Sequence, residues 1–533
     1  MKNNNSKTDS KIVLIGYERQ ENIGLRSITA YLEANGYKVL LLPFLPNNED
    51  LILSEVKSCS PCLIGFSIIF QYTIEEFSSL MHFLRTNNVT AHFTAGGHYP
   101  SLRPKETMNL IPDLDSVVRF EGEFTILELL KNLNSPENWE HISGLAFRKN
   151  SKVKITKTRP LISNLDILPK IKRGDPQEMS NGIKVAAMLA SRGCFYNCSF
   201  CSIRQFYGSA KGKLRRVRSP KNVVMEMAEL YNKENIRLFS FQDDDFGAKS
   251  MKQTEWLDEF LNELCKHNLA KNIAWKISCR VDDLDSDKLK KMIDHGLFAV
   301  YLGVESGNEI GLKTLNKNVS LEQNIFAVDL LKNNNVAVAI GFMLFDPSSS
   351  IDTIKQNIAF LRKIGEDGYF PINFCKMLPY AGTKIEEKLL EEGRLKGSVT
   401  QPTYNFKDPI IDWYEFFVQK IFSKRNFDPD GLVSLLQQTD FDWRLNCYFS
   451  ERNAHNGFEE NLRKIIKDTN NSAVETLEIL LENVLEIGVD KLLDEQDFIV
   501  NLFEKEWRAE MNAELTIKKM QASKDKKRVS VFN

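Results

Sequence analysis

The chain lacks several features that would place it in a common class of protein. None of its apolar runs approaches the ~18 residues that a membrane-spanning helix needs, so we predict no membrane span. Its 70 Lys and Arg residues balance 71 Asp and Glu residues, for a formal net charge of −1. Without a basic excess we do not expect nucleic acid as the main partner, although a local basic patch is compatible with a neutral total.

The lack of a signal sequence and the small number of cysteines bear on the cellular compartment. The first ten residues are polar and contain no apolar core of a signal sequence. Cysteine is sparse, with nine residues in 533, and three of them fall in one short run. This usage fits a reducing compartment better than a disulfide scaffold, so we expect a cytoplasmic protein. A chain of this length is too long for one core and predicts two to four domains.

The short run has the spacing C-x3-C-x2-C, formed by Cys194, Cys198 and Cys201. Three thiolates at this spacing can hold three corners of a cubane 4Fe–4S cluster and leave the fourth iron open to another molecule. The alternatives are a zinc site or buried structural cysteines. Zinc motifs usually pair two C-x2-C units, and no second unit follows this run.

Cys59 and Cys62 form a separate C-x2-C pair. A redox pair usually opens a helix, because the helix N-terminus lowers the pKa of the thiol. Cys62 instead directly precedes the apolar run 63–67, which predicts a strand. We therefore interpret this pair as structural.

Residues 11–150 alternate strand and helix patterns. The pattern predicts an α/β domain with a Rossmann-like, doubly wound parallel sheet, whose ligand crevice lies at the carboxyl ends of its strands. Strands are expected at 11–16, 38–42, 63–67, 91–95 and 116–118. Without a G-x-G-x-x-G loop, a nicotinamide or flavin dinucleotide is not indicated. Small residues at the strand ends instead suggest that the backbone passes close to another large ligand: Gly65, Ser67, Gly96, Gly97 and Gly122.

Residues 181–395 alternate strands and helices again. Strands near 188, 239, 277, 301, 340 and 375 predict a partial (β/α)6 barrel, whose chemistry belongs at the carboxyl ends of the strands. Polar residues stand at those ends: Asp243, Asp244, Ser278, Arg280 and Glu305. A buried charge is costly without a ligand or a partner, so these residues either bind a ligand or form an ion-pair network.

Residues 396–533 predict a mostly helical C-terminal domain, with helices at 411–423, 430–438, 472–487 and 496–514. This domain contains no metal or nucleophile motif, and we expect it to cap the barrel and shape a substrate pocket. The predicted layout is therefore a polar tail at 1–10, the sheet domain at 11–150, a linker at 151–180, the barrel at 181–395 and the helical domain at 396–533.

The cysteine spacing, Phe200 before the last cysteine and the apolar run 185–190 resemble the radical SAM superfamily. The glycine pattern of the first domain, with runs 96–101 and 121–124, resembles the cobalamin-binding domain of the cobalamin-dependent radical SAM enzymes. The resemblance implies that Cys194, Cys198 and Cys201 hold a catalytic 4Fe–4S cluster. Its open iron binds S-adenosylmethionine (SAM), which one electron cleaves to a 5′-deoxyadenosyl radical. For the first domain, the alternative is a degenerate Rossmann-like domain without a ligand.

The resemblance also implies the cofactor-binding residues. For SAM they are Asp243, Asp244, Ser278, Arg280, Glu305, Gly341 and Leu378. For cobalamin they are Gly65, Ser67, Gly96, Gly97, His98, Gly122 and Glu123. An acid after the second barrel strand would contact the SAM amino group, and Arg280 its carboxylate. The D-x-H-x-x-G run of methionine-synthase domains is missing from the loop at 17–24, so we predict cobalamin without a protein histidine on cobalt.

The function implied is a methyltransferase that methylates an unactivated carbon of a small-molecule or peptide substrate, as in natural product biosynthesis. SAM would supply both the methyl group, through cobalamin, and the radical. A flavodoxin or ferredoxin would donate the electron. One alternative is a cyclase or rearrangement enzyme that uses cobalamin as a redox partner. Another is a cobalamin-binding regulatory protein, against which the cysteine run argues.

Overall fold

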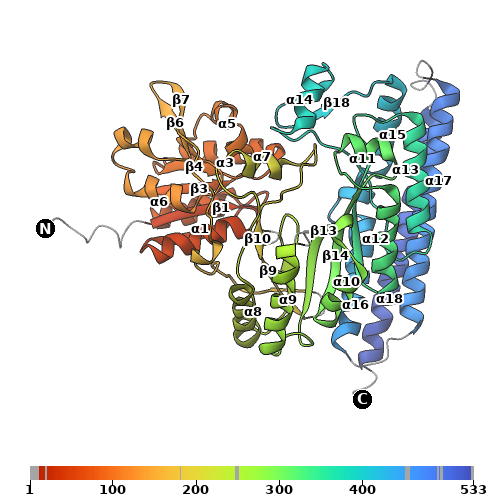
Figure 1. Ribbon diagram of the computed structural model, residues 1–533. Helices are drawn as coiled ribbons and strands as arrows, with labels where there is room; N and C mark the ends of the chain where they lie inside the picture. Colours follow the sequence, from red (N-terminus) through yellow and green to blue (C-terminus); the bar gives the residue numbers. More distant parts are fainter. Residues whose placement is uncertain are drawn as a thin grey trace. The chain divides into compact units, whose positions relative to one another are not determined.

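The structure is a computed structural model of the 533-residue chain (Figure 1). It describes residues 11–18, 21–179, 182–246, 251–450, 456–488, 491 and 496–529. The predicted polar tail 1–10 lies outside these residues. The chain divides into two compact units, of which the first comprises 1–177, 185–244 and 378–403 and the second 178–184, 245–377 and 404–533. The predicted domain boundaries stay predictions.

A seven-stranded sheet forms the centre of the first unit, with the strand order β2-β1-β3-β4-β5-β6-β7. Its first five strands are parallel, as predicted: β2 (Lys38–Pro43), β1 (Lys11–Gly16), β3 (Leu63–Ser67), β4 (His92–Gly96) and β5 (Ser116–Val118). The sequence analysis missed the antiparallel pair β6 (Leu145–Lys149) and β7 (Lys152–Ile155), which extends the sheet beyond β5.

Successive side chains of a strand point to opposite faces of the sheet, and helices bury both faces of this sheet. On β1, Ile12 and Leu14 join a core on one face, while Val13 and Ile15 join a core on the other. Helices α1 (Ile23–Ala34) and α6 (Glu123–Lys131) supply the first core. Helices α2 (Glu49–Cys59), α3 (Ile74–Thr86) and α5 (Pro104–Leu110) supply the second. The predicted doubly wound sheet is therefore confirmed.

The cysteine run also belongs to the first unit, which holds all but the first residue of β9 (Lys184–Met188). The run lies between β10 (Ser191–Arg192) and α7 (Ser202–Gly208). The elements that follow in this unit are β11 (Arg216–Val217), α8 (Pro220–Glu234), β12 (Ile236–Phe241), α14 (Lys384–Glu391) and β17 (Leu395–Gly397). Short elements complete the list: α4 (His98–Leu102), β8 (Gln177–Glu178) and β18 (Pro402–Tyr404).

The second unit contains four strands that pair in parallel in chain order. They are β13 (Ala274–Arg280), β14 (Leu297–Glu305), β15 (Ala337–Phe345) and β16 (Cys375–Lys376). With β9 and β12, all six strands predicted for the barrel are present, although β16 has only two residues. The alternating helices are α9 (Met251–Lys266), α10 (Ser286–Asp294), α11 (Glu309–Thr314), α12 (Leu321–Asn333) and α13 (Ile351–Gly365).

The C-terminal part of the second unit is helical, as predicted. Its helices are longer than the sequence indicated: α15 (Pro409–Phe427), α16 (Leu432–Phe449), α17 (Asn456–Ile487) and α18 (Gln496–Val529). Helices α17 and α18 lie side by side (Figure 1), and Glu506 of α18 accepts hydrogen bonds from Ser472 and Thr476 of α17.

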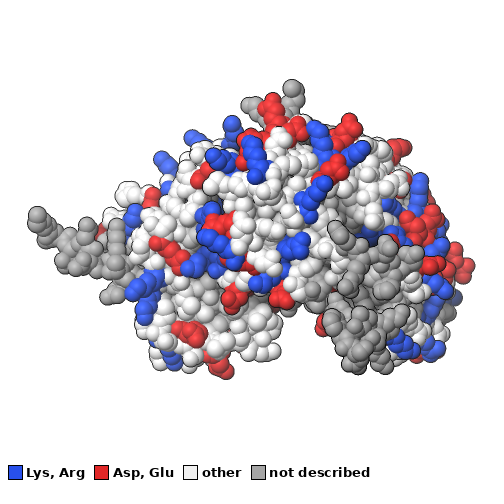
Figure 2. Space-filling view, turned by 90° about the horizontal axis from the view of Figure 1, so that it is seen from below, with Lys and Arg blue, Asp and Glu red and all other residues white. Residues whose placement is uncertain are grey.

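Within the described residues, no helix is long and apolar enough to cross a membrane. Figure 2 shows one face of the molecule, on which blue Lys and Arg side chains are interspersed with red Asp and Glu side chains. The balanced charge of the sequence is thus also mixed locally on this face.

Glu510 on α18 generates a prediction about pH. Burial raises its pKa to about 7, while Arg425 lowers it and Glu506 raises it. An unfolded chain loses this proton near pH ~4.3. The folded state therefore binds one more proton than the unfolded state between these values, so the free energy of unfolding falls as pH rises through this window.

We expect Glu510→Gln to remove this loss. In thermal or urea unfolding the variant should exceed the wild type by up to about 3 kcal/mol at pH 8, and by less than about 1 kcal/mol at pH 4.5. Glu504→Gln, on the same helix at a half-exposed residue 2.9 Å from Arg508, is the control and should not show this trend. A pH-independent difference for Glu510→Gln would contradict the prediction.

Candidate active site

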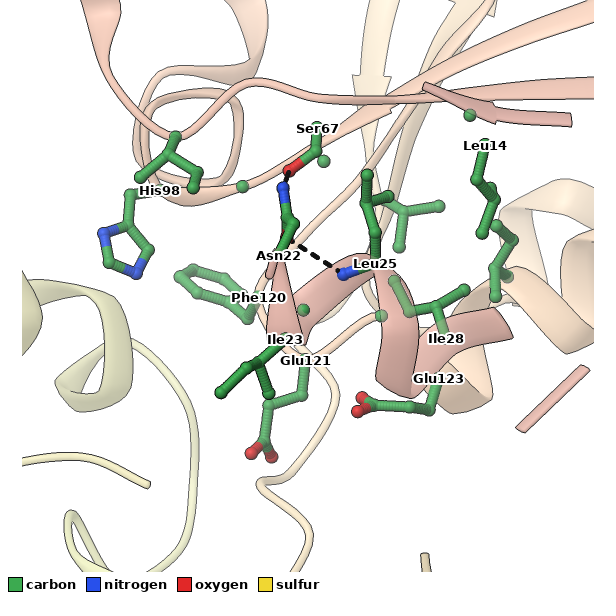
Figure 3. Close-up of a pocket in the computed structure, with 18 of the residues that line it drawn as sticks. Leu14, Asn22, Ile23, Leu25, Ile28, Ser67, His98, Phe120, Glu121 and Glu123 are labelled. Carbon is green, nitrogen blue, oxygen red and sulfur yellow. Dashed lines mark hydrogen bonds between the residues drawn. The ribbon is translucent and has the colours of Figure 1, made fainter. Parts of the chain in front are cut away.

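A cavity of about 440 Å³ opens at the carboxyl ends of β1, β3, β4 and β5 (Figure 3). Its volume falls within the ~300–1,000 Å³ typical of small-molecule sites. All seven residues predicted to bind cobalamin line it: Gly65, Ser67, Gly96, Gly97, His98, Gly122 and Glu123. The sequence pattern therefore marks one real concavity, at the edge of the sheet where a doubly wound fold places ligands.

The opposite wall of this cavity comes from the segments around the cysteine run. Ser191 and Arg192 of β10 line it, as do Phe206 and Tyr207 of α7. Phe206 and Tyr207 also pack with Phe120, which follows β5. A ligand in the cavity would therefore lie against β10 and α7, the two elements that flank the three cysteines.

Two glycines of the cavity are required by contacts within the protein, which the sequence analysis did not predict. Gly97 has a φ of +117°, and a Cβ there would lie 2.2 Å from the carbonyl oxygen of Ile68. At Gly65 a Cβ would lie 2.6 Å from a methyl group of Leu14. The packing of the sheet itself thus requires both glycines, whatever occupies the cavity.

His98 begins α4 at the rim of the cavity (Figure 3). Its ring packs on Phe206 with the ring centres 4.5 Å apart. Burial lowers the pKa of His98 to about 4, so the imidazole is neutral at neutral pH. The neutral His98 ring, which packs on Phe206 at the cavity, is suited to van der Waals contact with a ligand there.

Arg192 connects the cysteine run to the rim of the sheet. Its guanidinium donates to Glu123 at 2.6 Å and lies 3.3 Å from Glu121. Arg216 of β11 binds the same Glu121 at 2.7 Å, and its side chain is 2% exposed. Burial alone would raise the pKa of Glu123, but Arg192 and further hydrogen bonds outweigh it and hold that pKa below its usual value. Glu123, predicted to bind cobalamin, therefore already forms an ion pair with Arg192.

Asp243 and Asp244, predicted to bind SAM, hold the backbone that leads into Cys194. Asp243 accepts from the Ala190 amide at 3.0 Å and from the Ser191 hydroxyl. Asp244 accepts from the Gly193 amide at 2.8 Å and also lines the cavity. Burial raises the pKa of both acids, to about 6 for Asp244.

The three cysteines are half-buried on one loop, and Cys201 is the N-cap of α7. Across the ranges that the structure describes, no three Cys, His, Asp or Glu side chains gather closely enough to hold a metal ion. The donor set nonetheless suits an iron–sulfur cluster, because three thiolates come from eight consecutive residues.

Three other predicted SAM residues meet in the second unit: Arg280 and Glu305 end β13 and β14, and Gly341 lies in the middle of β15. Arg280 donates to Asp282 at 2.9 Å and to the carbonyl oxygen of Lys317. The ammonium of Lys317 lies 3.1 Å from Glu305. A Cβ on Gly341 would lie 3.5 Å from the same carboxylate. The structure thus brings Arg280, Glu305 and Gly341 together, within an ion-pair network that the sequence analysis named as the alternative.

The two remaining predicted SAM residues play different parts. Ser278, two residues before Arg280 on β13, accepts a backbone hydrogen bond from Phe246 at 3.0 Å through its carbonyl. Leu378 belongs to the first unit, follows β16 and is 43% exposed. Nothing in their surroundings identifies either as a ligand of SAM.

Sequence analysis missed the roles of Arg192, Arg216 and Lys317. Arg192 directly precedes the glycine and cysteine that open the cysteine run, which was the available signal. Lys317 lies twelve residues beyond Glu305 and is 3% exposed, so only the fold reveals its pairing.

Backbone strain also marks both regions. Twelve described non-glycine residues have positive φ, and ten of them are Asn or Ser. The other two are Phe120 at the cavity, with φ of 63°, and Glu305, with φ of 69°. Such conformations are costly for larger side chains and cluster at functional sites.

The separate cysteine pair behaves as a structural pair. Cys59 ends α2, and Cys62 directly precedes β3. Burial raises the pKa of both thiols. A redox-active cysteine needs a lowered pKa, so the redox interpretation gains no support here.

Comparisons with known proteins agree with these observations. Residues 15–130 match the model of the B12 binding domain, and residues 188–361 match that of the radical SAM superfamily. The chain combines a B12-binding domain with a radical SAM domain. The resemblance recognised in the sequence is thereby confirmed, and the protein is a cobalamin-dependent radical SAM enzyme.

Its relatives include an uncharacterized methyltransferase, PH0819, of Pyrococcus horikoshii, which is 27% identical over 70% of this chain and 80% of its own length. An anaerobic magnesium-protoporphyrin IX monomethyl ester cyclase of Rubrivivax gelatinosus is 26% identical over 76% of this chain and 75% of its own length. A solved structure, the cobalamin-dependent SAM radical enzyme OxsB with aqua-cobalamin and SAM bound, has a TM-score of 0.68 at 17% identity, covering 98% of this chain and 81% of that one. The predicted fold class, including the partial barrel, is confirmed by this likeness.

The ion pairs of Arg192 generate the second prediction. Arg192→Leu leaves Glu123 buried without its cation, and removing one partner of a buried pair typically costs ~3–5 kcal/mol. We expect a loss of that size in the free energy of urea unfolding.

Arg362→Leu is the matched control, because it breaks an ion pair with Glu478 at 2.5 Å whose side chains are 40% and 42% exposed. Exposed pairs contribute less than about 1 kcal/mol. Equal decreases in the free energy of unfolding of the two variants would show that the buried Arg192 ion pairs contribute no more to stability than an exposed pair.

Proposed function

We propose that the chain transfers the methyl group of SAM to an unactivated carbon of a small-molecule or peptide substrate. The observation that carries this proposal is the shared wall of the cavity. Residues that flank the three cysteines also line the crevice that the predicted cobalamin residues form. Two cofactors held at these places would be neighbours, as a reaction that uses both requires.

The residues present suit both groups. Cys194, Cys198 and Cys201 would hold the cluster, and the crevice at the sheet edge would hold cobalamin. When bound, these groups and SAM supply the radical and the methyl group, so the protein supplies binding, orientation and exclusion of water.

The chain contributes a rigid frame for this chemistry. Asp243 and Asp244 hold the segment from Ala190 to Gly193 through two backbone amides and the Ser191 hydroxyl. Gly193 adopts a φ of +85°, and a Cβ there would lie 1.9 Å from the carbonyl oxygen of Leu214. Both constraints act directly before Cys194 and determine where the cysteine loop begins.

We propose fewer residues for SAM binding than the sequence analysis predicted. Arg280 and Glu305 already bind protein partners, so SAM would have to share or displace those contacts. Tyr301, which lies opposite Ser278 on β14, is 43% exposed and places its hydroxyl over Gly341. We propose Glu305, Gly341 and Tyr301 as the side of this site that remains open to a ligand.

We also propose that no protein histidine binds cobalt. The loop after β1 contains no histidine at the position where methionine-synthase domains carry one. His98 lies two residues after β4 instead, and its ring packs on Phe206. We assign His98 to packing against the bound cofactor.

Ring formation or rearrangement is the second candidate. It is favoured by the cyclase of Rubrivivax gelatinosus, whose identity to this chain is nearly that of the methyltransferase. Either reaction requires an electron for the cluster, and we propose a flavodoxin or ferredoxin in a reducing compartment as the donor.

Labelled SAM separates the two candidates without knowledge of the substrate. Anaerobically reduced holoenzyme is incubated with SAM that carries a deuterated methyl group, and the protein-bound cobalamin is recovered for mass spectrometry. For a methyltransferase we expect the label in the cobalamin fraction. Cleavage of SAM to 5′-deoxyadenosine with no label on cobalamin would favour ring formation and overturn the methyl-transfer proposal.

Two variants should separate the cofactor sites. Ser67→Leu places bulk in the cavity, so reconstituted protein should lose cobalamin absorbance but keep about four irons per chain. Cys198→Ser should do the reverse. Ser54→Leu, at an exposed position of α2, is the control for the first variant.

The same samples test the cobalt environment. The electron paramagnetic resonance spectrum of reduced cobalt should lack nitrogen splitting in the wild type and stay unchanged in His98→Ala. Full cobalamin content in Ser67→Leu would refute the assignment of the cavity. Failure of the wild type to take up iron would overturn the assignment of the three cysteines to the cluster.

A further inference from the structure

Helix α18 carries a row of large apolar side chains that face solvent. Val500, Phe503, Trp507, Met511 and Leu515 are 51%, 46%, 46%, 36% and 48% exposed. They recur every three or four residues, so they form one stripe along the helix. The stripe extends over about 22 Å at ~1.5 Å per residue.

This stripe is separate from the face that α18 buries. Leu502, Glu506, Glu510, Ala513 and Ile517 are the buried positions, and Ala513 and Ile517 join a core with α16 and α17. The helix therefore uses one face to pack within its own unit and presents a second apolar face outward. A continuous exposed stripe of this kind is typical of an interaction surface.

We propose that the stripe is the interface of a symmetric dimer, in which α18 packs antiparallel against α18 of a second copy of this chain. In a two-fold interface the same patch meets itself. The stripe satisfies that condition: with Trp507 facing Trp507 of the partner copy, Phe503 falls opposite Met511, and Val500 falls within one residue, ~1.5 Å along the axis, of the position opposite Leu515. Every large side chain then meets another large side chain.

The charges at the two ends of the stripe favour the antiparallel arrangement. Asp497 is exposed one turn before Val500, and Lys518 is exposed one turn after Leu515. In the register above, each Asp497 falls within one residue of the position opposite a Lys518, which the lengths of the two side chains can span. A parallel pair would instead place Asp497 against Asp497 and Lys518 against Lys518, which like-charge repulsion disfavours.

A membrane surface is the competing occupant, because amphipathic helices also lie on lipid. Acidic groups argue against it. Glu504 and Glu514 lie beside the apolar side chains and pair with Arg508 at 2.9 Å and Lys518 at 3.9 Å, so the acids offset these two basic side chains beside the stripe. Helices that bind membranes typically carry Lys and Arg around the apolar face, since the lipid surface is anionic.

The test measures the mass of the full chain by sedimentation and light scattering across the micromolar range. We expect a concentration-dependent doubling of the mass of one chain. Trp507→Glu should abolish the doubling, and Asn512→Glu, at an exposed position on another face of α18, should leave it intact. Circular dichroism of each variant checks that the helices remain folded.

Charge exchange tests the register. Asp497→Lys alone and Lys518→Asp alone should each weaken the dimer at least several-fold, and the double exchange should restore it. A monomer at every concentration, or a dimer that survives Trp507→Glu, would overturn the proposal. Co-sedimentation of a monomer with phosphatidylserine vesicles, lost in Trp507→Glu, would overturn it in favour of the membrane. Failure of the double exchange to restore the dimer would overturn the antiparallel register.

Discussion

The buried contact between Arg192 and the acids at the rim of the first sheet is the constraint on which the rest of the site depends. Charges so far from water are stable only when they are paired. Arg192 binds Glu123, and Arg216 binds Glu121, so two basic residues on β10 and β11 match two acids after β5. The segment that opens the cysteine run is thereby held against the ends of the sheet strands, and the crevice between them has a defined width.

A second constraint acts on the other side of the same segment. Asp243 and Asp244 follow β12 and accept hydrogen bonds from the backbone amides of Ala190 and Gly193 and from the side-chain hydroxyl of Ser191. Acids that were expected to meet SAM thus also determine the path of the loop. The two roles need not conflict, because a carboxylate has two oxygens and several lone pairs. A substitution at either aspartate would nevertheless affect loop geometry as well as ligand binding.

Local patterns in the sequence predicted the elements and the general place of the site. Short, nearly continuous apolar runs located the five parallel strands, and small residues at strand ends located the cavity. The hairpin of β6 and β7 was missed because β7, with the sequence Lys-Val-Lys-Ile, buries little and has a weak apolar signal. The partners of Arg192 and Lys317 could not be predicted either, because such pairing depends on segments that only the fold brings together.

The glycines illustrate the difference between locating a site and explaining it. The prediction that small residues mark a crevice was useful, but Gly97 is required by the carbonyl of Ile68 and by its own positive φ. Strained backbone at Phe120 and Glu305 was invisible to pattern analysis, since neither residue type favours that conformation. Such strain persists only where surrounding contacts fix it, as the hydrogen bond from the Phe120 amide to Ser101 does. The conformations at these two residues are therefore a consequence of the assembled fold. They lie in the two regions where cofactors are expected, and the residue types alone would not have identified these positions.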